Sequence, residues 1–315
     1  MELIFRHVVS TGIRHSRCIL RKRNTIFGVR PAEFFRSHKC TIFLDSESEP
    51  AVDPITLDKQ ETVTLIGLNR PHCRNAVNRD MARQLVVAFK AFEDDPNSNI
   101  AVLHGKGDHF CSGYDLKELA VSGTQWILSE DSVSHMSKHG AMGPTRLHIK
   151  KPVIAAVNGY AVAGGLELAL LCDLRVFEKS TKVGILNRRF GVPLIDGGTV
   201  RLPAIVGLSN ALDMILTGRI IDSEDAQRMG IANRVCNDGE ALSMAVAMAK
   251  QISKYPQKCL KADRESTFHS VYNSESKKAS LDFELNNAFD VIASESVKGA
   301  QKFKDGAGRN ATSVQ

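Results

Sequence analysis

The chain has 315 residues, of which 43% are hydrophobic and 24% are charged, a composition typical of a folded globular protein with a sizeable core. It contains no run of about 18 apolar residues without a charge or a break, which argues against a membrane-spanning helix. Seven cysteines are scattered without a C-x-x-C pair or a metal-ligand spacing, so we expect reduced thiols and no metal site.

The first 45 residues carry most of the excess positive charge. The net charge of the chain is +6, and residues 1–40 are rich in Arg and Lys, interleaved with Ile, Leu, Phe and Val, with only Glu2 and Glu33 as acids. This composition is typical of a mitochondrial transit peptide, with a disordered basic tail as the alternative. We therefore assign residues 1–45 to a transit peptide and linker and expect a protein of the mitochondrial matrix. Without this segment the chain is close to neutral, so we expect no nucleic-acid partner.

The rest of the chain alternates predicted strands and helices in the manner of an α/β fold. The pattern predicts a strand at 62–69, a helix at 78–96 and a strand at 100–107. A second unit follows, with a strand at 152–157, a helix at 165–171 and a strand at 174–177. The stretch 123–143 has weak periodicity and is expected to be a mobile loop with a partial helix. We place an α/β core at 55–240 and a helical C-terminal region at 241–315.

Two glycine-containing turns stand directly before predicted helices. They lie in "GDHFCSGYDLKEL" and in "GYAVAGGLELAL". A glycine permits a tight turn, and the first N–H groups of a helix lack intrahelical partners. Two such turns side by side would offer a pair of donors to a developing oxyanion, although each could also be an ordinary strand-to-helix turn. Neither matches a nucleotide-binding glycine motif, which disfavours a nucleotide fold.

Four ordered motifs together resemble the enoyl-CoA hydratase/isomerase, or crotonase, superfamily. They are "LNRPHCRNAVN", "HFCSGYDLKEL", "KPVIAAVNGYAVAGGLELALLCDLRV" and "GTVRLPAIVGLSNALDMILTGRIIDSEDAQRMGIANRV". The resemblance spans about residues 60–310. It implies an α/β spiral of ββα units with a helical C-terminal part, assembled as a homotrimer or hexamer. It also implies an acyl-CoA thioester as substrate, with no cofactor apart from the coenzyme A that the substrate carries.

The resemblance also assigns roles to particular residues. The backbone N–H groups of Tyr114 and Gly164 would hold the thioester carbonyl oxygen, and Glu167 would transfer a proton or hold a water. An exposed acid that caps the helix is the alternative for Glu167. Trp126 falls in the segment that, in relatives, approaches the acyl group of the substrate. The expected binding residues are His72, Cys73, Arg74, Asn75 and Ala76 in the coenzyme A loop, together with Ser112, Gly113, Asp115, Gly165 and Asn187.

The sequence departs from the family pattern at Asn187. Hydratases of the family carry a second glutamate there, and an amide cannot transfer a proton as a carboxylic acid does. Asp196 is another acid nearby, with a plain turn residue as the alternative. We expect hydration of a 2-enoyl-CoA through a thioester enolate. The alternatives are an enoyl- or dienoyl-CoA isomerase that uses Glu167 and Asp196, and an acyl-CoA-binding homologue with weak catalysis.

Overall fold

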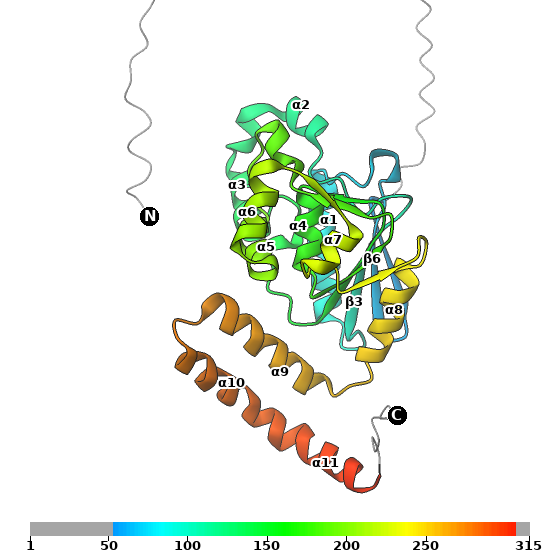
Figure 1. Cartoon of the computed structure of the whole chain (residues 1–315), viewed down its shortest axis with the longest axis vertical. Coiled ribbons are helices and arrows are strands. Elements are labelled where there is room, and N and C mark those ends of the chain that lie inside the picture. The colour runs from blue at the N-terminus through cyan, green and yellow to red at the C-terminus, as the bar shows by residue number, and fades with distance from the viewer. Residues whose placement is uncertain (1–52, 307–315) are drawn as a thin grey trace, which may run out of the picture. The chain divides into compact units, whose positions relative to one another are not determined.

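A computed structural model describes residues 53–306, so the predicted transit peptide at 1–45 lies outside the described residues. The centre of the fold is a six-stranded sheet in the order β1-β2-β3-β4-β6-β9 (Figure 1). Strand β1 pairs antiparallel with β2, and the other neighbours are parallel. The strands are β1 (Ile55–Gln60), β2 (Val63–Leu68), β3 (Ile100–Gly105), β4 (Val153–Val157), β6 (Leu174–Glu178) and β9 (Arg234–Cys236).

The four strands predicted in this sheet are confirmed as β2, β3, β4 and β6, whereas β1 and β9 were missed. Strand β1 has one buried residue, Ile55, and four exposed ones at its end. An edge strand of this kind lacks the apolar run or clean alternation that identifies a strand in a sequence. The central strands carry that signal because both of their faces are covered.

Helix α8 (Ala241–Ile252) covers one face of the central sheet. Ile100 and Val102 of β3 point to this face, because successive side chains of a strand alternate between its two sides. Ala241, Ala245 and Ala249 line the facing side of the helix. Their small side chains let the helix approach the sheet closely. Helix α8 therefore belongs to the packed core of the sheet.

The opposite face packs against α1 (Arg79–Asp94) and α4 (Gly164–Leu171). Leu103 of β3 and Phe177 of β6 point to this side. Helix α4 is buried at every position except Leu171, which confirms the predicted helix at 165–171. Because this helix begins at the end of a short connection from β4, its N-terminus lies at one edge of the sheet, where the site is built.

A second, three-stranded sheet has the order β5-β7-β8. Strand β5 pairs parallel with β7, and β7 pairs antiparallel with β8. Strand β5 leads directly into α4, so this small sheet fixes the entry to the helix. The strands are β5 (Tyr160–Val162), β7 (Lys182–Gly184) and β8 (Ile220–Asp222).

The expectation of a mobile loop with only a partial helix at 123–143 underestimates its helical content, because most of the stretch is helical. Helix α2 (Leu116–Ile127) and helix α3 (Glu130–Lys138) occupy this stretch. Helix α2 has no buried residue, and Gly123 interrupts it with φ 66° and ψ −179°. Without a buried stripe the sequence shows no helical periodicity, which explains the error.

The remaining described elements are mostly helical. Asp222 caps helix α7 (Ser223–Arg228), since its side chain accepts a hydrogen bond from the Asp225 N–H. No helix in residues 53–306 is long and apolar enough to cross a membrane. The helices not yet named are α5 (Gly198–Val206), α6 (Leu208–Thr217), α9 (Gln257–Phe268), α10 (Lys277–Val291) and α11 (Val297–Lys304).

Candidate active site

One cavity gathers many of the predicted site residues. Its volume is about 400 Å³, and its walls come from α1, α2, α3, α4 and the 3-10 helix Leu186–Phe190. Apolar side chains, among them Trp126, Met142 and Phe190, form much of the wall. The predicted residues that line the cavity are Arg74, Ser112, Tyr114, Gly164, Glu167 and Asn187, with Asp196 next to Glu167.

Two turns bring backbone N–H groups to this cavity. Gly113 has φ +98° and precedes Tyr114, and Ala163 has φ +55° and precedes Gly164. Among the described residues, neither the Tyr114 nor the Gly164 N–H donates a hydrogen bond. A Cβ placed on Gly113 would lie 3.0 Å from the Gly164 nitrogen, so the two turns are in contact. The cavity wall therefore carries two neighbouring backbone donors that are free to bind a ligand.

Gly165 makes the close approach of these turns possible. A Cβ on Gly165 would lie 2.1 Å from the backbone oxygen of Cys111, a distance that no side chain tolerates. Gly165 therefore packs behind the donor turn, against the segment that carries the first donor. Gly165, which was predicted to bind the substrate, thus supports the donor turn through the close packing of its backbone.

Glu167 is buried in the first turn of α4, with 1% of its surface exposed. The exposed capping acid considered from the sequence is therefore wrong. Its Oε1 accepts hydrogen bonds from the N–H groups of Asp196, at 3.0 Å, and Gly198, at 2.8 Å. Its Oε2 has no hydrogen bond within the described part of the chain. One oxygen thus fixes the carboxyl group, and the other is left for a ligand in the cavity.

Burial raises the pKa of Glu167 to about 7, because the charged form loses its water. The hydrogen bond from Gly198 lowers this pKa, and the negative charge of Asp196 raises it further. A carboxyl group with a pKa near neutrality exchanges a proton readily in both directions, which is what general acid and base catalysis requires.

Asp196 is also buried, and its carboxylate is held by partners from a distant segment. Its Oδ1 accepts hydrogen bonds from the Met142 N–H, at 2.9 Å, and the Thr145 hydroxyl, at 2.5 Å. The side chain of Arg201 donates to its backbone oxygen. Burial raises the pKa of Asp196, and the Thr145 bond opposes this effect. Asp196 therefore anchors the turn whose backbone N–H groups hold Glu167.

Asn187 lines the same cavity from the 3-10 helix Leu186–Phe190. Its side chain is 7% exposed. Its Oδ1 is buried without a hydrogen-bond partner among the described residues. The amide at the position where the resemblance implies a second glutamate therefore lies on the cavity wall, with its oxygen unpaired.

The predicted coenzyme A loop has an exposed side and a buried side. His72 and Arg74 are exposed, whereas Asn75 and Ala76 are buried. The Asn75 amide donates to the backbone oxygens of Lys106 and His109 and accepts from the Arg70 N–H. Asn75 thus holds the shape of the loop, in which both Arg74 and Asn75 have positive φ.

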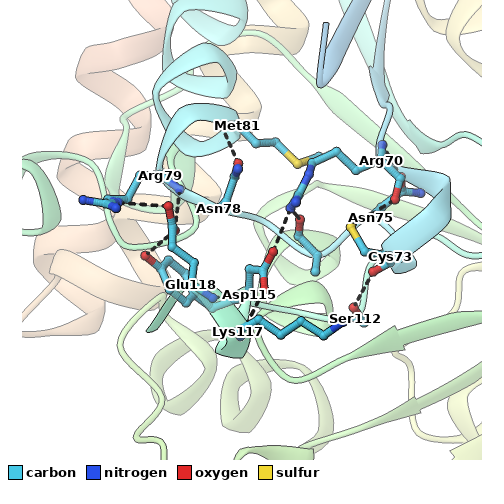
Figure 2. Close-up of polar contacts among 12 residues, drawn as sticks. Arg70, Cys73, Asn75, Asn78, Arg79, Met81, Ser112, Asp115, Lys117 and Glu118 are labelled. Atoms are coloured by element: carbon cyan, nitrogen blue, oxygen red, sulfur yellow. Dashed lines mark hydrogen bonds and ion pairs between the residues drawn. The ribbon is translucent and has the colours of Figure 1, made fainter. Parts of the chain in front are cut away.

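Polar contacts join this loop to the first donor turn, as Figure 2 shows. An ion pair of 3.1 Å links Arg70 to Asp115, and the hydroxyl of Ser112 donates to the Cys73 backbone oxygen at 3.5 Å. Asp115 also caps α2 by accepting from the N–H groups of Lys117 and Glu118. Asp115 and Cys73 are therefore parts of the connection between the loop and the turn.

The sequence analysis missed a clamp that holds α2 against α1. The backbone N–H and the Nε of Arg79 both donate to the Glu118 carboxylate (Figure 2). The Arg79 guanidinium also lies 4.6 Å from the ring centre of Trp126, near the other end of α2. Glu118 and Arg79 are 39 residues apart, and no local pattern links them. The clamp fixes the helix that carries the expected acyl contact, Trp126.

Comparison with known proteins identifies the family. The family described as enoyl-CoA hydratase/isomerase matches residues 58–308, and the chain belongs to it. A crotonyl-CoA hydratase of Syntrophomonas wolfei is 33% identical over 207 residues, which are 64% of this chain and 76% of that protein. A 2,3-dehydroadipyl-CoA hydratase of Escherichia coli is 32% identical over 212 residues, which are 67% of this chain and 80% of that protein.

Solved structures confirm the predicted crotonase fold. An enoyl-CoA hydratase from Mycobacterium tuberculosis superposes with a TM-score of 0.73 at 30% identity, covering 81% of this chain and 96% of that one. An enoyl-CoA hydratase from Bacillus anthracis gives a TM-score of 0.74 at 27% identity, covering 80% and 96%. The mixed α/β architecture with its central sheet is therefore that of the family.

Proposed function

We propose that the protein hydrates a 2-enoyl-CoA thioester. The observation that carries this proposal is the placement of one buried carboxyl group, that of Glu167, in a cavity that also carries two unpaired backbone donors. The printed functions of its relatives, crotonyl-CoA hydratase among them, support the choice of hydration. No cofactor is needed, because coenzyme A arrives as part of the substrate.

In this proposal each part of the site has a separate task. The N–H groups of Tyr114 and Gly164 bind the thioester oxygen and stabilise the negative charge that forms on it. Glu167 takes a proton from water and returns one to the carbon next to the carbonyl group. The exposed side of the coenzyme A loop, with His72 and Arg74, binds the nucleotide end of the substrate. Asp196 holds the turn that orients Glu167.

A specific observation supports isomerisation as the second candidate function. Glu167 and Asp196 both line the cavity, and burial raises the pKa of each. Two such carboxyl groups can move a proton from one carbon to another. Against this, the Oδ1 of Asp196 is already bound by the Met142 N–H and the Thr145 hydroxyl, and the relatives named above are hydratases. We therefore rank isomerisation below hydration.

The two functions are separated by offering the purified protein crotonyl-CoA, a 3-enoyl-CoA and a 3,5-dienoyl-CoA and following product mass. We expect crotonyl-CoA to gain one water and the other two thioesters to remain largely unchanged. A shifted double bond at constant mass would establish the isomerase instead. Binding of all three without any reaction would establish the acyl-CoA-binding homologue.

We also propose that the protein works in the mitochondrial matrix. This proposal rests on the basic, acid-poor composition of residues 1–45, a segment that lies outside the described residues. The relatives named above are bacterial proteins and give it no support.

We further propose a homotrimer or hexamer. Helix α10 and its continuation carry an apolar row at intervals of three or four residues, and each side chain in it is about half exposed: Leu281, Leu285, Phe289 and Ile292. A row of this kind is typical of a surface that a partner covers.

One import experiment tests both the location and the assembly. The labelled chain should be shortened inside energised mitochondria, and the shortened product should elute at three or six times the mass of one chain. An uncut chain would contradict the location, and elution as a single copy would contradict the assembly.

A further inference from the structure

Asn187 is a buried amide to which the rest of the structure assigns no partner. Its backbone oxygen accepts hydrogen bonds from the N–H groups of Gly191 and Val192, which fix the turn. Its side chain makes no hydrogen bond with the described residues, and Oδ1 is shielded from solvent. A buried polar group without a partner destabilises a fold. Because the Asn187 side chain has no hydrogen-bond partner in the described fold, we assign it a partner that enters the cavity as a ligand.

Glu167 supplies the second half of the same arrangement. It lines the cavity with Asn187, and its Oε1 is occupied by the two backbone N–H groups while Oε2 is free. A free carboxylate oxygen and an amide oxygen are both acceptors. Water is small enough to enter the cavity and donates two hydrogen bonds, one for each of these acceptors.

We propose that Asn187 binds the oxygen atom that is added to the β-carbon of the acyl group, as water before the addition and as the β-hydroxyl group after it. Asn187 is thus a positioning residue, and Glu167 is the one side chain that carries a proton. This inference rests on the proposed hydratase function and extends it to the residue that replaces the second glutamate of the family.

The addition balances with one carboxyl group. Water, held by the Asn187 Oδ1 through one hydrogen, gives its other proton to Glu167, and its oxygen forms a bond to the β-carbon. The π electrons of the double bond move onto the thioester, where the N–H groups of Tyr114 and Gly164 stabilise the enolate oxygen. Glu167 then returns a proton to the α-carbon, the enolate electrons form the new C–H bond, and Glu167 is ionised again.

The test compares two ligands that differ only at the β-carbon, 3-hydroxybutyryl-CoA and butyryl-CoA. Asn187→Leu keeps the size of the side chain and removes its hydrogen bonds. We expect this variant to bind 3-hydroxybutyryl-CoA about tenfold more weakly, as for one lost hydrogen bond, and to bind butyryl-CoA as the unchanged protein does. In hydration its kcat should fall, while its KM for crotonyl-CoA, which lacks the oxygen, should change little.

Asn210→Leu is the matched control, because Asn210 lies on α6 and is not part of the cavity wall. It should change neither affinity. Equal weakening of both ligands in Asn187→Leu, or no weakening of either, would overturn the inference. Failure of the proposed function has a different signature, namely an unchanged protein that binds both ligands but hydrates no enoyl-CoA, and in that case the ligand comparison still decides the role of Asn187.

Discussion

Replacing Glu167 by Gln is expected to lower the turnover of crotonyl-CoA by about 10²- to 10⁴-fold, the range for loss of a general acid or base. Gln keeps the shape of the side chain and an oxygen that can accept from the N–H groups of Asp196 and Gly198. It cannot take a proton from water. The affinity for butyryl-CoA should therefore stay within a small factor of that of the unchanged protein, while the rate is lost.

Glu178→Gln is the control for this variant. Glu178 is a buried glutamate in β6 and lies outside the cavity. The substitution should leave turnover unchanged, which would show that a buried charge can be removed without loss of rate. If Glu167→Gln hydrated crotonyl-CoA at the normal rate, Glu167 would not carry the proton, and the proposed mechanism would fail.

The raised pKa of Glu167 gives the same prediction a pH dependence. Hydration requires the ionised form, which accepts the proton, so kcat should rise with pH through about 7. Dehydration of the hydroxyacyl-CoA runs through the same steps in reverse and also starts from ionised Glu167, which takes the α-proton, so its rate should rise over the same range. Asp196 and Arg201 act on this equilibrium with opposite sign. The other charged or titratable groups on the cavity wall are Arg74, Arg79, Arg83, Tyr114, Asp131 and His135.

The raised pKa of Glu167 also makes the stability of the fold depend on pH. Below the ordinary pKa of 4.5, Glu167 is protonated in both the folded and the unfolded chain, so its ionisation does not change the free energy of unfolding. Between 4.5 and about 7 the unfolded chain releases the proton first, so the free energy of unfolding falls as pH rises through this window. Glu167→Gln removes this loss. The variant should therefore unfold at a higher temperature than the unchanged protein above pH 7, and a lower one there would contradict the buried, proton-binding carboxyl group.

The sequence predicted the strands and helices that bury a regular pattern of apolar residues. Strand β3 and helix α4 were predicted because their own apolar residues form the pattern that identifies them. The two glycine turns before helices also followed from the sequence, and the resemblance to the crotonase superfamily marked Tyr114 and Gly164 in them as donors. These features depend on short stretches of chain.

Other parts of the site depend on contacts between distant segments, which a sequence pattern does not contain. Asp196 meets Thr145 across 51 residues, and Arg79 meets Glu118 across 39. The sequence marked Asp196 as a candidate acid, but only the structure shows what holds its carboxylate. The start of helix α2 was predicted after its glycine turn, but its full extent was not, because the helix is fixed by Arg79 and has no buried residue of its own.

Gly113→Ala is expected to lower kcat for crotonyl-CoA by about 10²- to 10³-fold, the cost of a lost oxyanion donor. Gly113 has φ +98°, which an alanine adopts only with strain. The new Cβ would also lie 3.0 Å from both the Gly164 nitrogen and the Ala163 Cβ. The turn must shift to relieve these contacts, and Tyr114, the next residue, moves with it. One methyl group thus disturbs both proposed donors.

Gly207→Ala separates this effect from backbone strain alone. Gly207 has φ +77°, and within the described chain no atom beyond its immediate neighbours lies within 4 Å of a Cβ placed there. It joins α5 to α6, outside the cavity. Both variants should lose about 1–3 kcal/mol of stability from the positive φ, measured by denaturant unfolding. Only Gly113→Ala should lose rate at saturating substrate, because only there does the strained backbone carry the groups that stabilise the enolate. Equal rates in the two variants would mean that the carbonyl oxygen is held elsewhere.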